Sequence, residues 1–434
     1  MTHAHPRVLM GLLFYPRGGS AHVARNLAHA LPRVGWDVTV LSGSVPGHGD
    51  ARRFYHDLDV VAMDMAAGFP LHPSYEDRPG APDRGFGLLD DADAELHAAA
   101  WTRALEAAGA PRADVLHLHH LTPLYEAAAR VAPRVPIVGH LHGTELLFLE
   151  AVERDPLRWP HGPAWAERMR RWALQAERLI VLSETQIERA ERVLDVDPER
   201  YTLIPNGYDP ELFFTPRPVD RAAEWAKILP GAGIEADTPV ILYVGRFTEV
   251  KRVPLLIEAY ERARPGFCRR APLVLVGGFP GEHEGEHPEQ TIARVGARDV
   301  HLAGWHDHDD LPDILAASDV VVLPSVREQF GQVLVEGMAC GLPAIAVDAH
   351  GPADIVDHGR TGWLVEPDDV QGMTNALVEA VNRPAERRRR GAAAAADVAE
   401  RYAWPSLAHE VAGLYDNVRG SDAMMLRTNP VPTH

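Results

Sequence analysis

The chain has 434 residues, too many for one hydrophobic core, because single cores stop growing near about 250–300 residues. Its formal net charge of −18 argues against nucleic acid and anionic membranes as main partners, since both would repel it. Two cysteines without ligand-like spacing favour a reducing compartment. With no cationic leader and no apolar run of about 18 residues, we expect a cytoplasmic protein without strong membrane association.

Short apolar runs alternate with amphipathic or alanine-rich segments through the first half of the chain. The runs cover residues 7–14, 36–42, 58–63, 114–119, 135–142 and 178–183. This alternation is typical of βαβ units on a parallel sheet. We therefore predict a doubly wound, Rossmann-like α/β domain over residues 1–215.

The stretch 214–240 is rich in proline and glycine and predicts the linker between two domains. The alternation then resumes with runs at 239–247, 271–278, 299–305, 319–325 and 342–348. A second Rossmann-like domain is expected over residues 216–404. The cationic run Glu386 to Arg390 is expected to be solvated, and residues 421–434 to form a flexible tail.

Two glutamates follow the run 319–325, where ligands of such sheets bind. Glu328 comes just before Gly331, which opens a predicted helix whose free N–H groups can bind an anion. Glu336 lies among apolar residues of that helix, so its carboxylate needs a hydrogen-bond partner. Sugar or ribose hydroxyls would suit, because an ionised carboxylate only accepts hydrogen bonds. The alternative is two surface glutamates placed there by chance.

Two cations follow the run 239–247. Arg246 lies at its end, and Lys251 lies in the turn before the next predicted helix. The 43 basic residues include only two lysines, Lys227 and Lys251, which favours a functional Lys251 over a merely solvated one. Together the cations could neutralise a diphosphate, Arg246 as a planar fork and Lys251 as a point charge.

The first half offers weaker signals after two of its runs. Gly18 and Gly19 follow the first run and let the backbone approach a ligand closely, although a tight turn could also need glycine. Period-two alternation places His140 and His142 on one face of the run 135–142, with His142 nearer the ligand edge. Strand histidines are more often satisfied core residues than catalysts, so both interpretations stay open.

Taken together, the motifs resemble those of the retaining glycosyltransferases of family four. They are "GGS" at 18–20, "HGTE" at 142–145, "PNGYD" at 205–209, "VGRFTEVK" at 244–251 and "PSVREQFGQVLVEGMACGLPAIA" at 324–346. The resemblance covers nearly the whole chain. It implies the GT-B fold, with two Rossmann-like domains facing a central cleft, a nucleotide-sugar-binding second domain, an acceptor-binding first domain, and a helix at 405–420 that crosses back to the first domain.

The resemblance also implies roles for individual residues. Arg246 and Lys251 would hold the donor diphosphate, Glu328 the transferred sugar, and Glu336 the ribose. The full donor set is Gly19, Arg246, Lys251, Glu328, Phe330, Gly331, Gln332 and Glu336. The acceptor set is Gly18, Gly19, Ser20, His142 and Glu145. The catalytic set is His142, Glu328, Arg246 and Lys251, and neither a metal ligand nor a cofactor is expected.

The sequence thus predicts metal-independent, retaining transfer of a sugar from a UDP-sugar, or alternatively a GDP-sugar, to a small polar acceptor. Gln329 and Arg252 depart from the family pattern and leave the sugar uncertain. A nucleotide-sugar epimerase or a sugar-phosphate synthase on the same fold stays open, as does a homodimer. The last rival is a metal-dependent hydrolase, suggested by "HLHH" at 117–120 and "HLH" at 140–142 but without an acidic partner at ligand spacing.

Overall fold

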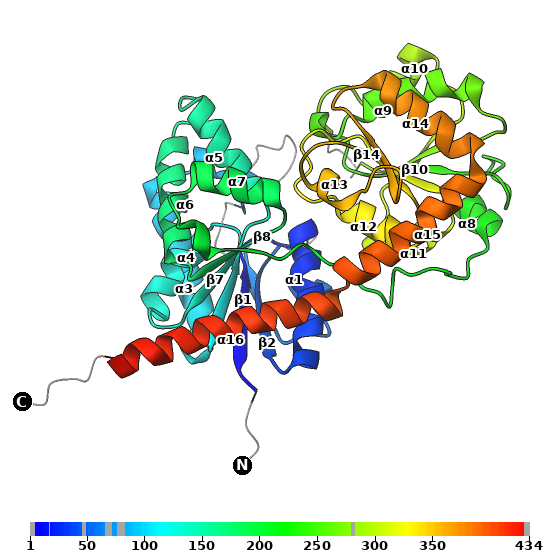
Figure 1. Ribbon diagram of the computed structural model, residues 1–434. Coiled ribbons are helices and arrows are strands. Elements are labelled where there is room, and N and C mark those ends of the chain that lie inside the picture. The colour runs from blue at the N-terminus through cyan, green and yellow to red at the C-terminus, as the bar shows by residue number, and fades with distance from the viewer. Residues whose placement is uncertain are drawn as a thin grey trace, which may run out of the picture. The chain divides into compact units, whose positions relative to one another are not determined.

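The computed structural model describes residues 5–16, 18–45, 49–65, 72–75, 83–278 and 283–428. The chain divides into two compact units (Figure 1). Unit 1 comprises Met1–Pro205 and Trp404–His434, and unit 2 comprises Asn206–Ala403. Each unit is an α/β domain built on its own parallel sheet, as the alternation of runs predicts.

The sheet of unit 1 has seven strands among the described residues, in the order β3-β2-β1-β6-β7-β8-β9. They are β1 (Arg7–Leu12), β2 (Asp37–Ser44), β3 (Val60–Asp64), β6 (Val115–His119), β7 (Ile137–His140), β8 (Arg178–Val181) and β9 (Tyr201–Leu203). A separate pair, β4 (His72–Ser74) and β5 (Asp83–Gly85), lies outside this sheet.

Helices cover both faces of the unit 1 sheet. They are α1 (Gly19–Ala30), α2 (Ala51–Phe54), α3 (Asp91–Ala107), α4 (Leu124–Val131), α5 (Thr144–Arg154), α6 (Gly162–Gln175), α7 (Glu184–Val193) and α16 (Trp404–Thr428). Alternate strand residues feed two separate cores, since Leu9 packs with α3 to α6 while Val8 packs with α1 and α16. Figure 1 shows α16 running along unit 1, so the end of the chain completes the core of the first domain.

The sheet of unit 2 has six strands within the described ranges, in the order β12-β11-β10-β13-β14-β15. They are β10 (Ile241–Gly245), β11 (Leu273–Gly277), β12 (Val300–Gly304), β13 (Val320–Leu323), β14 (Ala344–Val347) and β15 (Gly362–Val365). The helices are α8 (Arg221–Ile228), α9 (Val253–Ala263), α10 (Pro288–Val295), α11 (Leu311–Ala316), α12 (Gln332–Ala339), α13 (His350–Ile355), α14 (Val370–Asn382) and α15 (Pro384–Arg401).

All eleven predicted runs form strands, and the doubly wound fold of both domains is confirmed. The stretch expected to link the domains contains α8 instead, which packs into unit 2: Trp225 is buried and donates from Nε1 to the carbonyl of Ala317 at 3.0 Å. The division between the units falls at Pro205 and Asn206. At the other end, α16 continues to Thr428, and residues 429–434 lie outside the described part of the chain.

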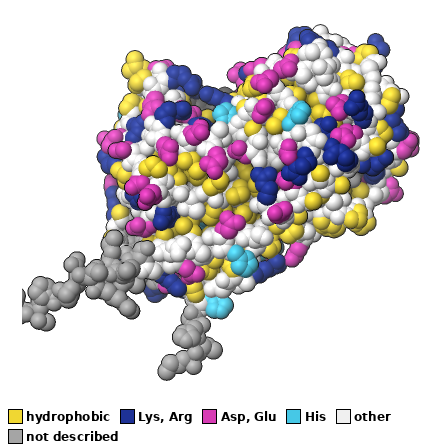
Figure 2. All heavy atoms as spheres, in the orientation of Figure 1, with side chains coloured by type: hydrophobic (Ala, Val, Ile, Leu, Met, Phe, Trp, Pro, Cys, Tyr) yellow, Lys and Arg dark blue, Asp and Glu magenta, His cyan; other side chains and the backbone are white. Residues whose placement is uncertain are grey.

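The surface carries both signs of charge. On the face shown in Figure 2, acidic and basic side chains are interspersed rather than gathered into one patch. Among the residues that the structure describes, no helix has both the length and the apolar character needed to cross a bilayer.

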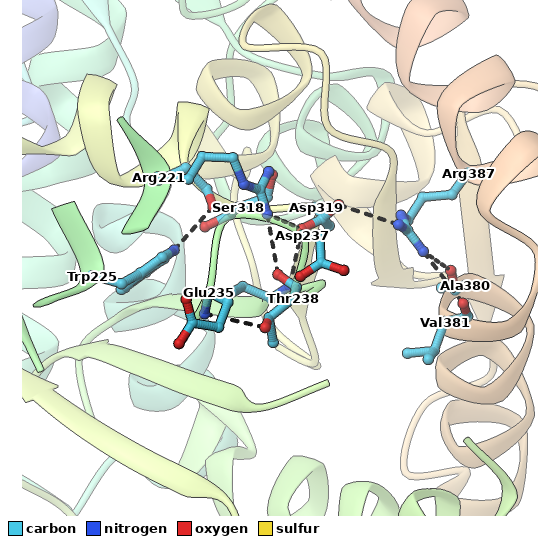
Figure 3. Close-up of polar contacts among 12 residues, drawn as sticks. Arg221, Trp225, Glu235, Asp237, Thr238, Ser318, Asp319, Ala380, Val381 and Arg387 are labelled. Atoms are coloured by element: carbon cyan, nitrogen blue, oxygen red, sulfur yellow. Dashed lines mark hydrogen bonds and ion pairs between the residues drawn. The ribbon is translucent and has the colours of Figure 1, made fainter. Parts of the chain in front are cut away.

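The cationic run Glu386 to Arg390 was wrongly predicted to be solvated throughout. Arg387 and Arg390 are 9% and 7% exposed. Figure 3 shows Arg387 reaching from α15 to Asp319, with its Nη2 3.2 Å from Oδ1 of Asp319, and donating to the carbonyl of Ala380 at 2.7 Å. Arg390 lies over the ring of Trp363 at 4.1 Å from its centroid. Long arginine side chains here bury their stems and tie helices to the sheet.

The second carboxylate oxygen of Asp319 completes this network (Figure 3). Oδ2 accepts from Nη2 of Arg221 at 2.5 Å and from the backbone N–H of Val240 at 3.0 Å. Arg221 also donates to the carbonyl of Ser318 at 3.2 Å. The network fastens α8 and α15 to the start of β13, at the edge of the sheet opposite to that where ligands bind.

Candidate functional site

Each sheet has one point where the strand order reverses. In unit 2, β10 lies between β11 and β13, and in unit 1, β1 lies between β2 and β6. Ligands of doubly wound sheets bind beyond the carboxyl ends of the strands at such a point. The loops after β10 and β13, and those after β1 and β6, are therefore the positions to examine.

In unit 2 the two switch-point loops are joined to each other. The backbone N–H of Val326, after β13, donates to the carbonyl of Val250, after β10, at 3.0 Å. Lys251 Nζ forms an ion pair with Oε2 of Glu328, and each of the two side chains is 17% exposed. The structure thus brings together the lysine and the first glutamate that the sequence singled out.

Arg246 belongs to the same group of charges. The hydroxyl of Tyr243 donates to the carbonyl of Arg246 at 2.7 Å. Burial raises the pKa of Tyr243, the charge of Glu328 raises it further, and the charge of Arg246 lowers it. Both charges therefore lie close enough to this hydroxyl to act on it.

The two loops also hold polar atoms with spare hydrogen-bonding capacity. Ser325 Oγ and Thr248 Oγ1 are buried and have no hydrogen-bond partner among the described residues. An ammonium group has three N–H donors, and in the described part of the chain Glu328 is the acceptor found for Lys251. Buried polar groups without partners are uncommon, and these two loops hold one each.

The predicted helix after Phe330 is α12, and two glycines shape its entry. Gly331 has φ of 107°, a left-handed conformation that favours glycine. A side chain at Gly351 would place its Cβ 2.4 Å from the carbonyl oxygen of Phe330, so the backbone of Gly351 packs directly against that of Phe330. Gly351 N–H also donates to the carbonyl of Glu328 at 3.3 Å. These contacts fix the segment from Glu328 to Gly331 at the start of α12.

Glu336 is buried, with 3% of its surface exposed, and has hydrogen-bond partners, as predicted. Its Oε1 accepts from Nε2 of His308 at 2.9 Å and from Nε2 of Gln332 at 3.1 Å. Gln332 also donates to the carbonyl of Gly207 at 2.9 Å. The sequence did not predict His308, which lies 28 positions from Glu336 and has no spacing signal.

In unit 1, Gly18 and Gly19 follow β1 at the start of α1. Gly18 has φ of −151°, which any residue adopts, and a Cβ at either glycine would meet no atom within 4 Å. Neither the turn nor the local packing therefore requires glycine here. The surface around both glycines and the partly exposed Ser20 is open.

Four imidazoles on β6, on β7 and just after β7 form a stack, which we call the histidine ladder: His117, His119, His140 and His142. Neighbouring ring centroids lie 4.4–5.3 Å apart. The rings hydrogen-bond in pairs, His117 Nε2 with His140 Nδ1 at 3.2 Å and His119 Nδ1 with His142 Nε2 at 2.9 Å. Burial lowers the pKa of all four, that of His117 to about 3, so the ladder is neutral near pH 7.

Glu145 lies beneath the ladder and is fully buried. Its Oε1 accepts from the backbone N–H of His142 at 2.8 Å, while Oε2 lies 3.2 Å from Nδ1 of His120 and accepts from Oγ1 of Thr144 at 3.3 Å. Glu145 therefore contacts His120 and the backbone of His142, but it does not join the three histidines whose ligand atoms lie together. Both oxygens of Glu145 are occupied by contacts within the chain. These contacts hold the start of α5 against the end of β7.

A metal site at the ladder would need His117, His119 and His140, whose ligand atoms lie within 4.8 Å of one another. Both nitrogens of His117 already have partners, His140 and the hydroxyl of Tyr415 at 2.5 Å. A metal would have to displace one of them, and no carboxylate belongs to this group of three. The contacts present therefore favour hydrogen bonding within the ladder over a metal site.

A cavity of about 430 Å³ lies beside α9 and borders the loop after β10, since Phe247, Thr248 and Glu249 belong to its lining. Its lining does not include Lys251, Glu328 or Glu336. Five carboxylates line it: Glu249, Glu258, Glu284, Glu286 and Asp368. This acidic lining would repel a diphosphate, so the charged loops at the switch point are the better candidate.

Comparison with known proteins identifies the family. Residues 17–212 match the model described as Glycosyltransferase Family 4, and residues 227–397 match that of Glycosyl transferases group 1. A D-inositol 3-phosphate glycosyltransferase from Stackebrandtia nassauensis is 30% identical over 327 residues, which are 73% of this chain and 71% of that protein. The chain belongs to glycosyltransferase family 4.

Solved structures agree on the fold of this family 4 glycosyltransferase. Sucrose-phosphate synthase from Thermosynechococcus elongatus aligns with a TM-score of 0.72 and 21% identity, over 96% of this chain and 100% of that one. Anabaena HepE, solved with UDP and glucose, aligns with a TM-score of 0.71 and 20% identity, over 95% and 100%. The predicted GT-B fold, with two Rossmann-like domains, is confirmed.

Proposed function

We propose that this glycosyltransferase moves a sugar from a UDP-sugar to a small polar acceptor, with retention of the anomeric configuration and without a metal. The observation that supports this most is the Lys251–Glu328 pair, which lies at the switch point of unit 2 with hydrogen-bonding capacity to spare. HepE was solved with UDP and glucose, which favours uridine over guanosine as the donor's nucleoside.

Unit 2 is the proposed donor domain. Arg246 and Lys251 neutralise the diphosphate, Lys251 exchanging part of its contact with Glu328 for phosphate oxygens. Glu328 then accepts hydrogen bonds from hydroxyls of the transferred sugar, while the N–H groups at Phe330 and Gly331 face an anion at the start of α12. Of the proposed donor contacts, Gly19 alone comes from unit 1.

Glu336 is the proposed ribose ligand. A carboxylate can accept about four hydrogen bonds, and two donors, His308 and Gln332, are already in place on Oε1. They hold the carboxylate in one orientation and leave capacity for ribose hydroxyls. Gln332 contributes in the same way, by linking Glu336 to the carbonyl of Gly207.

The proposed chemistry uses no enzyme nucleophile. The sugar–phosphate bond breaks, the acceptor oxygen attacks on the same face, and the departing phosphate oxygen takes the acceptor's proton. Such a step needs strong stabilisation of the leaving diphosphate, which Arg246, Lys251 and the N-terminus of α12 supply before the reaction begins. No general base on the acceptor side is then required, in contrast to an inverting enzyme.

Unit 1 is the proposed acceptor domain. The open surface at Gly18, Gly19 and Ser20 fits a polyhydroxylated molecule, which backbone N–H groups can bind at close range. His142 is the proposed polar contact beside it, and Glu145 would act by holding the backbone of His142. The relative from Stackebrandtia is named for D-inositol 3-phosphate, so inositol phosphates are the first acceptors to test.

Two experiments test the proposal. A thermal-shift screen of UDP, GDP and ADP should single out UDP, because a ligand at a hundred times its dissociation constant stabilises by about 2.7 kcal/mol. NMR of the anomeric proton in the product then reports the stereochemistry. An inverted product would exclude the retaining mechanism, donor turnover without acceptor would favour an epimerase, and transfer to a sugar phosphate would favour a synthase.

A further inference from the structure

The histidine ladder contains a contact that bears directly on His142. His119 is fully buried, and its Nδ1 lies 2.9 Å from Nε2 of His142. The other nitrogen of His119, Nε2, is buried without a hydrogen-bond partner in the described part of the chain. His142 is the most exposed of the four ladder residues, at 9%.

These contacts decide where the protons lie. A neutral imidazole carries one N–H donor and one acceptor nitrogen. A proton on Nε2 of His119 would leave a buried N–H without an acceptor, which is rarer in proteins than an acceptor without a donor. The proton therefore belongs on Nδ1, which donates to Nε2 of His142. His142 must then carry its own proton on Nδ1.

We propose that His119 is a positioning residue, which keeps His142 in the Nδ1–H form so that it donates a hydrogen bond to an oxygen of the acceptor or of the transferred sugar. The identity of the ligand in this inference rests on the proposed function. The positions of the protons rest on the contacts of the histidines alone. Nδ1 of His142 makes no hydrogen bond to the described residues, so it is available to a ligand. A neutral donor suits a hydroxyl or ester oxygen, and it cannot serve as a general base through that atom.

The surrounding contacts leave the ring of His142 little freedom. Glu145 accepts from its backbone N–H at 2.8 Å, and the ring of His140 stacks on it with centroids 4.4 Å apart. The hydrogen bond from His119 restricts rotation of the His142 ring about its Cβ–Cγ bond. Small displacements of a group that binds the reacting substrate can cost about a hundredfold in rate.

Nitrogen-15 NMR of the histidine side chains in the full chain tests the proton positions. The signals of His142 are assigned from their loss in His142→Gln, and two-bond correlations identify the protonated nitrogen. We expect a proton on Nδ1 of His142 at pH 7.5, with the Nε2–H form increasing in His119→Leu. A wild-type His142 protonated on Nε2 would overturn the inference.

Kinetics test the consequence for transfer. His119→Leu should lower kcat by roughly tenfold to a hundredfold while UDP affinity is unchanged, because the donor domain is untouched. His119→Asn should restore most of the loss, since the Asn side-chain N–H can take the place of Nδ1–H. Equal kcat for wild type and His119→Leu, or no rescue by asparagine, would contradict a positioning role.

Tyr415→Phe is the matched control. It removes a buried hydrogen bond to His117 in the same ladder but leaves the His119–His142 contact in place. We expect a loss of stability with the His142 proton still on Nδ1, and a shift of that proton would contradict the inference. A wild-type enzyme without transfer activity on any sugar nucleotide would overturn the proposed function, while the NMR result would still decide the role of His119.

Discussion

Asp319 and Glu328 lie before and after strand β13, and their side chains are 18% and 17% exposed. Asp319 pairs with two arginines and Glu328 with one lysine. The two sites also differ in how many of their polar atoms have hydrogen-bond partners. Asp319 accepts with both oxygens from Arg221, Arg387 and the backbone. Glu328 pairs with Lys251, in loops where Ser325 and Thr248 hold buried hydroxyls without partners among the described residues. Exposure does not distinguish the two carboxylates, whereas the occupation of their oxygens does, even though Nε of Arg221 in the Asp319 network is buried without a partner among the described residues.

The physical reason lies in what each group loses when a ligand binds. A carboxylate whose two oxygens are both occupied, as in Asp319, gains little from a ligand, because each contact would have to be exchanged for an equivalent one. Unpartnered buried groups already carry a desolvation cost, which a ligand can remove by supplying the missing partner. The Asp319 network should therefore act on stability alone, and the Lys251–Glu328 pair mainly on donor binding.

The largest expected effect is on stability. Asp319→Ala should lower the free energy of unfolding by about 3–5 kcal/mol, because it leaves Arg221 and Arg387 without their common partner. Urea denaturation measures the loss, and calorimetry should find UDP affinity unchanged at temperatures where the variant is folded. Arg389→Ala is the control, since this neighbouring arginine is exposed and should change stability little. A weakened UDP affinity in Asp319→Ala would contradict the expectation that the Asp319 network acts on stability alone.

The reverse pattern is expected on the other side of β13. Lys251→Ala should weaken donor binding about tenfold to a hundredfold or more, since a hydrogen bond to a charged group contributes roughly 1.5–3 kcal/mol, and Arg246→Ala should do the same. Lys227→Ala is a matched control: it removes the same charge from a lysine whose side chain is 70% exposed, and affinity should be unchanged. Calorimetry with UDP measures all three, and unaltered affinity in both Lys251→Ala and Arg246→Ala would remove the diphosphate assignment.

The sequence predicted that Lys251 and Glu328 lie close together, because this follows from the position of each residue relative to the nearest strand. Once two parallel sheets are recognised, the residues just after each strand must gather at one edge, which was enough to bring Lys251 and Glu328 together. The sheet edges were harder: β9 and β15 have three and four residues, too short for a clear alternation. Neither strand was predicted.

Contacts over long sequence distances were also missed. His308 and Glu336 are 28 positions apart, and Arg387 and Asp319 are 68 apart, so no spacing rule connects them. A run of arginines predicts solvent exposure because all of its residues are charged. A long arginine side chain can nevertheless bring its charge into a buried network. Glu145 stays a predicted acceptor-binding residue, but its motif does not reveal that both of its oxygens also have contacts within the chain.

The histidine ladder extends the comparison to buried bases that carry no charge. The pKa of His117 is about 3 in the folded chain and near 6.5 when unfolded, so between these values the unfolded chain binds a proton that the folded chain does not. The free energy of unfolding therefore falls as the pH drops below about 6.5, by up to about 1.4 kcal/mol per pH unit for this group. Urea denaturation at several pH values measures how the free energy of unfolding changes with pH. This change per pH unit should be smaller in the double variant His117→Phe, Tyr415→Phe than in the wild type. Equal slopes would mean that His117 is not held neutral.

The smallest expected effect is none at all: EDTA treatment should leave the rate of transfer unchanged. Arg246, Lys251 and the N-terminus of α12 already supply positive charge for the leaving diphosphate, so a divalent ion would add little. Initial rates before and after chelation measure this, with Mg²⁺ and Zn²⁺ added back separately. A rate restored by Mg²⁺ would mean that the two cations do not suffice for the diphosphate. A rate restored by Zn²⁺ alone would instead point to His117, His119 and His140, whose hydrogen bonds would then have to rearrange around a metal.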